Sequence, residues 1–226
     1  RSTIQDKPVT VLYGLIIVSL AGLLPLPPLL QDQDYHQFAD QRELFGIPNF
    51  WNVVSNLTFI AVGAVGLLRF RANATTTMLF SGVFLTGFGS SYYHLNPTDV
   101  TLFWDRLPMT FCFAAILAAV VEERVDARAG AMLLRPLLAI GIFSLLLWRW
   151  TDDLRLYAWA QFFPFLTLVL ILRLFPPKYT GAFYWIVAAA LYALAKLLEF
   201  YDHAIFSVGS IVSGHTLKHL TAAAAA

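Results

Sequence analysis

Long apolar runs, separated by short polar or proline-containing segments, repeat along almost the whole chain. The hydrocarbon core of a bilayer is about 30 Å thick and takes about 20 predominantly apolar helical residues, so runs of that length predict membrane-spanning helices. Eight such runs are found, at residues 9–30, 49–70, 76–94, 101–121, 129–148, 154–175 and 181–200, and in a last segment that ends at the C-terminal alanines. The pattern therefore predicts an all-α, polytopic helical bundle in a membrane.

Composition and charge narrow the class of protein further. Of the 226 residues, 58% are hydrophobic and 13% are charged, whereas soluble domains are about 45–50% apolar and about 25% charged. The net charge of +1 comes without a basic stripe, so we expect no nucleic-acid partner. The single cysteine, Cys112, excludes a disulfide framework. The lipid bilayer is the expected surrounding, and nothing in the composition indicates an obligate protein partner.

The first apolar run, residues 9–30, is too long for a cleaved signal peptide, and its flanking residues are too weakly charged for one. Residues 25–28 offer no small-residue cleavage pattern. We therefore expect a retained N-terminal transmembrane helix. Because the chain lacks an initial Met and stops within an apolar segment, we also expect it to be the ordered portion of a slightly longer protein.

The distribution of Lys and Arg predicts how the helices are oriented. Most of these residues fall on one set of helix ends, which carries Arg1, Lys7, Arg69, Arg71, Arg124, Arg128, Arg173 and Lys178. The opposite ends carry Arg42, Arg149 and Arg155. Since the more basic side of a membrane protein faces the cytoplasm, we expect both termini in the cytoplasm and the acidic loop 31–48 on the outer side.

Five polar residues within or beside the apolar runs are candidates for a functional site. Ser90 and His94 are spaced i, i+4, as are His215 and His219, and each pair therefore shares one helix face. Asp105 begins the run 101–121 after a short outer turn. Ionisable side chains at membrane depth cost about 2.5–3.5 kcal/mol each, which makes them functional candidates. All five are expected toward the outer ends of their helices.

Three neutral imidazoles and one open position are what a catalytic zinc site requires. His94, His215 and His219 would supply the imidazoles. Asp105 would accept the proton of the zinc-bound water, and Ser90 would donate to a developing oxyanion. Two alternatives remain open: a receptor or ion-coupled transporter that uses the same groups as a gate, and bis-histidine haem binding, which leaves Asp105 without a role.

At these residues the chain resembles the alkaline ceramidase family, within the CREST superfamily of seven-helix membrane hydrolases. The resemblance rests on Ser90-x-x-x-His94, on Asp105 in the segment 104–109 (WDRLPM), on His215-x-x-x-His219 and on the segment 50–56 (FWNVVSN). It implies that the three His bind Zn²⁺, that Asp105 is the general base and that Ser90 assists the oxyanion.

The same resemblance implies a fold and a substrate. The fold would be one integral-membrane domain, residues 1–226, in which about 49–226 form the seven-helix hydrolase core and about 9–30 form an additional N-terminal helix. The expected reaction is cleavage of the amide bond of ceramide or a related N-acyl membrane lipid, with zinc-bound water as the nucleophile.

The acidic loop before the core raises the question of a second cation, Ca²⁺. Eukaryotic members of the family have an acidic calcium cluster here, and Asp40 and Glu43 match its D-x-x-E spacing. Asn49 stands where those members have an acidic residue, and Asn52 completes the candidate set. The alternative is a solvated acidic loop in which Arg42 pairs with its neighbours.

Two further charged features are expected to be structural. Lys196 and Glu199 are spaced i, i+3 and predict a neutralising ion pair at the outer end of the run 181–200. Arg106, beside Asp105, is expected to extend its side chain toward the membrane surface.

Overall fold

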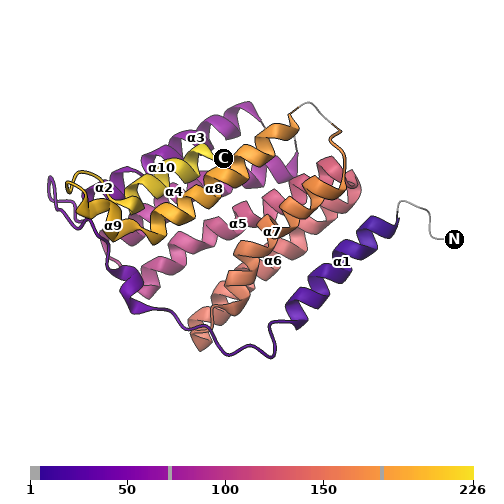
Figure 1. Ribbon diagram of the computed structural model, residues 1–226, viewed down its shortest axis with the longest axis horizontal. Helices are drawn as coiled ribbons and strands as arrows, with labels where there is room; N and C mark the ends of the chain where they lie inside the picture. Colours follow the sequence, from indigo (N-terminus) through magenta and orange to yellow (C-terminus); the bar gives the residue numbers. More distant parts are fainter. Residues whose placement is uncertain (1–5, 71–72, 179–180) are drawn as a thin grey trace. The chain divides into compact units, whose positions relative to one another are not determined.

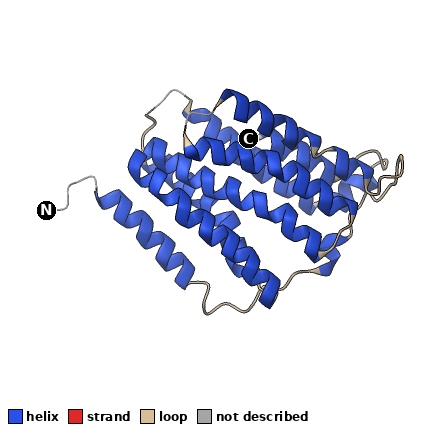
Figure 2. Ribbon diagram, turned by 180° about the vertical axis from the view of Figure 1, so that it is seen from behind, coloured by secondary structure: helices blue, strands red, loops and turns tan. Residues whose placement is uncertain are grey.

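The computed structural model describes residues 6–70, 73–178 and 181–226, so Arg1 and Arg71 lie outside the described residues. Within these ranges the chain is helical and has no strand, apart from one isolated bridge between Leu44 and Ile47 (Figure 2). Five segments are long and apolar enough to cross a membrane: Phe50–Arg69, Asp99–Arg124, Ala127–Thr151, Arg155–Leu174 and Phe183–Phe200. The protein is therefore an all-α membrane protein, as predicted, while the predicted number of eight spans stays a prediction.

The chain divides into two compact units. The first comprises residues 1–31 and 113–179, and the second comprises residues 32–112 and 180–226. The first contains α1 (Asp6–Ala21), the later part of α5 (Asp99–Arg124), α6 (Ala127–Thr151) and α7 (Arg155–Leu174). The second contains η1 (Gln33–His36), α2 (Phe50–Val54), α3 (Leu57–Arg69), α4 (Ala74–Leu95), the earlier part of α5, α8 (Ala182–Phe200), α9 (Asp202–Ser207) and α10 (Gly214–Ala224). The expected single domain stays a prediction.

In the first unit, the N-terminal helix is shorter than the apolar run predicts. α6 packs against α7, and α1 is joined to α7 by a 2.9 Å hydrogen bond from Trp159 Nε1 to Ser19 Oγ. The expected helix 9–30 is wrong in its second half, because α1 ends at Ala21. Prolines within residues 25–28 lack the N–H that a continuing helix needs.

Arg155, at the start of α7, binds the segment that follows α1. Its Nη1 donates to the carbonyl of Leu23 at 3.0 Å and also to that of Leu26. Its guanidinium pairs with Asp153 at 2.7 Å, and this hydrogen bonding lowers the pKa of the Asp153 carboxyl. The apolar residues after Ala21 therefore form an anchored loop.

In the second unit, α3 packs along α4, and α10 packs against α8 while also contacting α2 and α3 (Figure 1). Glycine makes the first of these contacts possible, because a Cβ at Gly63 would lie 2.4 Å from the backbone N of Phe84. α10 has 11 residues. Its N-cap is Ser213, whose side chain accepts from the N–H of Thr216 at 3.1 Å.

The expected helix 49–70 is broken in the structure into α2 and α3. Ser55 Oγ and Asn56 Nδ2 both donate to the carbonyl of Asn52, at 3.1 and 2.7 Å. Side chains that bond nearby carbonyls compete with the regular helical pattern. The break positions Ser55 and Asn52 toward α10, where the candidate site lies.

Candidate metal centre

Three buried histidines converge in the second unit. His94 comes from the last turn of α4, and His215 and His219 come from one face of α10. One ring nitrogen from each residue lies within 4.8 Å of the corresponding nitrogens of the other two, and the residues are 1%, 4% and 2% exposed. We call these residues the His triad.

The His triad fits a tetrahedral metal ion. His94 Nε2 and His219 Nε2 lie 3.3 Å apart, and two nitrogens bound to one tetrahedral Zn²⁺ at 2.0–2.1 Å would be about 3.3 Å apart. Among the described residues, the buried His215 Nε2 has no hydrogen-bond partner. Because an unsatisfied buried polar atom is costly, this nitrogen is well suited to a metal. A third imidazole supplies a ligand atom within the same 4.8 Å, which is one imidazole more than bis-histidine haem binding uses.

His219 is held in one orientation by the broken helix. Ser55 Oγ lies 2.7 Å from His219 Nδ1. With Nδ1 engaged in this way, Nε2 faces His94. Partners of this kind select the ring orientation of metal-binding histidines.

Ser90 and Asp105 are brought together beside this cluster. The Ser90 hydroxyl interacts with the Asp105 carboxylate, and both residues are buried. Ser90 precedes His94 by one helical turn on α4. The contact depends on Gly89, because a Cβ there would lie 2.2 Å from the carbonyl oxygen of Trp104 on α5. Sequence reasoning did not identify Gly89.

The segment around η1 covers the His triad. The buried ring of Phe38 lies 4.6 Å from that of His94 and 4.8 Å from that of His215, between centroids. His36 hydrogen-bonds this segment to α4 and α5. Its Nδ1 lies 2.9 Å from Tyr93 Oη, and its Nε2 lies 3.2 Å from Asp99 Oδ1. The apolar Phe38 side chain therefore separates the imidazoles from the polar loop.

Asp202 positions both the segment around η1 and α10. Its Oδ1 accepts from the backbone N–H of His215 at 2.7 Å, and its Oδ2 accepts from that of Ala39 at 2.9 Å. Gly214 permits the close approach of α10, because a Cβ there would lie 2.2 Å from the carbonyl oxygen of Leu198. No local sequence pattern links Asp202 to residues so far along the chain.

The candidate calcium residues have other partners in the structure. Both carboxylate oxygens of Asp40 accept from Arg42, at 2.8 and 2.6 Å, as the alternative of a paired acidic loop predicts. Asn49 donates to the carbonyl of His94 at 2.8 Å, and Asn52 Oδ1 accepts from Thr216 at 3.0 Å. Glu43 is exposed. A calcium site stays a prediction.

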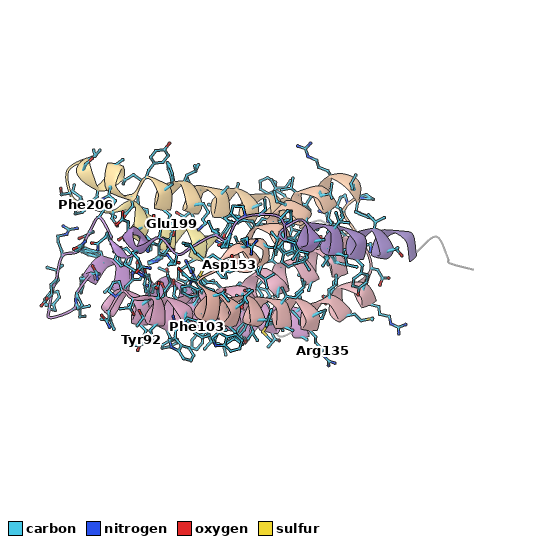
Figure 3. All side chains as sticks on the ribbon, turned by 90° about the horizontal axis from the view of Figure 1, so that it is seen from below. Tyr92, Phe103, Arg135, Asp153, Glu199 and Phe206 are labelled. Atoms are coloured by element: carbon cyan, nitrogen blue, oxygen red, sulfur yellow. The ribbon has the colours of Figure 1, made fainter. Side chains whose placement is uncertain are left out.

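Polar and charged residues from η1, α5, α8 and α10 lie near the His triad. Glu199 lies on α8 and is labelled in Figure 3. It pairs with Lys196 Nζ at 2.5 Å, as predicted, and also with Lys218 Nζ at 2.8 Å, which was not predicted. Tyr35 Oη donates to Glu199 at 3.1 Å, because burial and this carboxylate raise the pKa of Tyr35 and keep it protonated. The expectation for Arg106 is wrong: the residue is buried, and its guanidinium lies over the Tyr35 ring, 5.5 Å from the centroid.

Comparison with known proteins identifies a family. A protein-family model described as Ceramidase matches residues 45–177, which is more than half of the chain. The match includes Ser90, His94 and Asp105 and ends before α10. No curated protein matches the chain.

Proposed function

Because the chain belongs to the ceramidase family, we propose that it is a zinc-dependent membrane amidohydrolase that cleaves ceramide or a related N-acyl lipid. The family implies a hydrolase that acts on lipid amides, and the apolar helices imply a bilayer around it. The observation that carries the proposal is the His triad, whose ligand atoms lie within 4.8 Å of one another. The buried His215 Nε2, which has no hydrogen-bond partner in the described part of the chain, supports the presence of a metal ion.

His94, His215 and His219 would hold the zinc ion. When bound, zinc supplies a Lewis acid that polarises the amide carbonyl and makes water a stronger nucleophile near neutral pH. The Ser55 hydroxyl, 2.7 Å from His219 Nδ1, keeps Nε2 of that ring directed at the metal. Phe38, packed on His94 and His215, limits access of bulk water from the loop side.

Asp105 and Ser90 would handle the proton and the developing charge. The Asp105 carboxylate accepts the proton of the attacking water and returns it to the leaving amine, as a general base and then a general acid. The Ser90 hydroxyl, which interacts with Asp105, donates to the carbonyl oxygen as negative charge develops on it. Helix α4 supplies both Ser90 and His94, which supports their action on the same bond.

We further propose that the active site faces the outer side of the membrane and that both termini are cytoplasmic. This orientation rests on the excess of Lys and Arg at one set of helix ends. The His triad lies at the opposite ends, since His94 is in the last turn of α4 and His215 is in the first turn of α10.

The experiment that tests the function is hydrolysis of a fluorescent N-acyl sphingoid lipid by the purified protein in detergent. We expect release of the free fatty acid, loss of activity on chelation and recovery on addition of Zn²⁺. Activity that is unchanged when all metal has been removed would contradict the proposed mechanism. Absence of amide hydrolysis from the zinc-loaded protein would contradict the substrate class.

A further inference from the structure

Arg42 joins two loops of the second unit. Its Nε and Nη2 donate to the two carboxylate oxygens of Asp40 at 2.8 and 2.6 Å, and Nη2 also donates to the backbone carbonyl of Ile211 at 2.9 Å. The guanidinium lies over the Phe206 ring, 5.3 Å from its centroid. Both loops extend beyond α2 and α9 at one end of this unit (Figure 1). Arg42 therefore links the loop before α2 to the connection between α9 and α10.

Asn52 links the same two regions at a second point. Its Nδ2 donates to the backbone carbonyl of Asp40 at 3.2 Å, and its Oδ1 accepts from Thr216 Oγ1 at 3.0 Å. Asp40 and Asn52 are both buried. His215, a proposed zinc ligand, lies in the sequence between Ile211 and Thr216. The two links therefore fix the chain on both sides of His215.

The cation in this arrangement is part of the chain itself. The Asp40 side chain is 1% exposed, whereas that of Arg42 is 42% exposed. A buried carboxylate is costly unless a positive partner also satisfies its oxygens. The planar guanidinium has several N–H donors in a fixed arrangement, so it can bond both carboxylate oxygens and a further acceptor at once. It therefore neutralises Asp40 and bridges the two loops together.

The residues at this position do not fit Ca²⁺. A calcium ion takes about 6–8 oxygen ligands, but both carboxylate oxygens of Asp40 accept from Arg42, and Asn52 Oδ1 accepts from α10. Glu43 is exposed. Within the described ranges, the His triad is the only group of three or more His, Cys, Asp or Glu side chains close enough to share a metal ion. Arg42 occupies the oxygens that Ca²⁺ would need.

We propose that the Arg42 guanidinium takes the place of a divalent cation at these loops, and that Arg42 is a positioning residue for the zinc ligand His215. The first part is independent of the proposed function, whereas the second rests on the His triad being the metal centre. Two consequences follow from the geometry. Ca²⁺ is not needed for stability, zinc binding or turnover, and loss of the guanidinium weakens zinc binding although Arg42 is not itself a ligand.

The first arm of the test removes all metal from the purified protein and restores either Zn²⁺ alone or Zn²⁺ with Ca²⁺. We expect the same unfolding midpoint, zinc affinity and rate of N-acyl lipid hydrolysis in both cases. Mg²⁺ at the same concentration controls for ionic strength. A rise of the midpoint with Ca²⁺ but not with Mg²⁺, or a similarly selective gain in zinc affinity or turnover, would overturn the replacement of a divalent cation by Arg42.

The second arm measures zinc affinity of Arg42 variants by competition with a chelator. Arg42→Met should lower the affinity by about tenfold, the size expected when a contact that positions a metal ligand is lost. Arg42→Lys should be intermediate, because an ammonium keeps the charge but not the planar set of donors. Arg149→Met changes an exposed arginine of α6 and should keep wild-type affinity. Equal affinity of Arg42→Met and wild type would overturn the positioning role.

A paired variant separates positioning from charge neutralisation. Arg42→Met alone leaves the buried Asp40 carboxylate without its cation, which destabilises a protein whatever else the cation does. Asp40→Asn combined with Arg42→Met removes both charges. If Arg42 positions α10 through Ile211, the zinc affinity of this paired variant should stay about tenfold low. Return of the affinity to the wild-type value would show that Arg42 only neutralises Asp40, and would overturn the positioning role.

Hydrogen exchange gives a measurement that needs neither zinc nor substrate. In the metal-free protein, the backbone N–H groups of His215 and Thr216 bond Asp202 and Ser213. These amides should exchange about tenfold or more faster in Arg42→Met and in the paired variant, whereas the amides of α6 keep their rates. An equal increase along the whole chain would overturn the positioning role. If no amide is hydrolysed, the proposed function fails, and the calcium and exchange measurements still decide the role of Arg42.

Discussion

Ser55 Oγ lies 2.7 Å from Nδ1 of His219, across the contact between the broken helix α2/α3 and α10. This hydrogen bond leaves His219 Nε2 on the side of His94, 3.3 Å from its Nε2. The geometry of the His triad therefore depends on a residue that is not itself a proposed ligand. Ser55 reaches this position because the helix 49–70 does not continue through it.

Ser55→Ala should weaken zinc binding without abolishing it. Loss of a hydrogen bond that orients a metal-binding histidine typically costs 10–100-fold in affinity, so we expect a decrease of about that size. Competition with a zinc chelator of known affinity measures it. Ser207→Ala is the control, because Ser207 is exposed and donates to the carbonyl of Ala204 within its own helix. Equal zinc affinity of Ser55→Ala and wild type would show that the hydrogen bond has no orienting role.

Asp105→Asn should separate metal binding from catalysis. The substitution keeps the shape of the side chain and an oxygen that accepts from Ser90, so zinc content should be unchanged. The turnover number should fall by about 10²–10⁴, the usual contribution of a general base. Zinc analysis alongside hydrolysis of the N-acyl lipid measures both effects. If zinc is lost, Asp105 is a ligand instead, and if full activity remains, it is not the base.

Gly89→Ala should disturb the contact of α4 with α5 that brings Ser90 to Asp105. The new Cβ would lie 2.2 Å from the backbone oxygen of Trp104, which cannot move aside as a flexible side chain can. We expect a loss of about 1–3 kcal/mol in the free energy of unfolding, together with lower turnover.

Gly14→Ala is the matched control for this change, because a Cβ at Gly14 meets nothing within 4 Å. Replacing a helical glycine in open space should be neutral or stabilise by about 0.5–1 kcal/mol. Thermal unfolding midpoints of both variants, measured in the same detergent, give the comparison. Wild-type stability and turnover of Gly89→Ala would contradict the described approach of the two helices.

The orientation in the membrane can be tested with topology reporters. Reporters at the C-terminus and in the loop 124–128 should be cytoplasmic, and a tag near residues 31–37 should be accessible from outside. The reason is that most Lys and Arg residues lie at the helix ends on the same side as the loop 124–128. Cysteine-accessibility labelling in intact cells reads out each position. The opposite pattern would place the active site on the cytoplasmic side and leave the chemistry unaffected.

Helical periodicity explains why most of the candidate site was predictable. The i, i+4 spacing of His215 and His219 places both on one face of a helix whichever way that helix packs, and Ser90 and His94 follow the same rule. The Lys196–Glu199 pair is equally local. By contrast, Phe38, Asp202 and Lys218 contact partners that are distant in the sequence, and no local pattern indicates such contacts.

The end of the first helix, which was predicted wrongly, and the interruption within the otherwise matched span 49–70 both have physical causes. Apolarity alone predicts that the first helix continues through residues 25–28. The prolines there cannot continue a helix, and Arg155 instead binds two carbonyls of the loop that follows α1. In the run 49–70, Ser55 and Asn56 bond the carbonyl of Asn52 and interrupt the helix. Mean hydropathy over a run conceals single polar residues, whereas the hydrogen bonds of those residues determine the local backbone conformation.

The most direct test of the central claim is the zinc content of the purified wild-type protein and of its histidine variants. We expect about one zinc per chain in the wild type and in His203→Ala, an exposed histidine that hydrogen-bonds the carbonyl of Gln37. His94→Ala, His215→Ala and His219→Ala should each lose the metal, because three protein ligands are the norm for a catalytic zinc site. Full zinc content in all three variants, or no zinc in the wild type after purification and reloading, would contradict the assignment of the His triad as the metal centre.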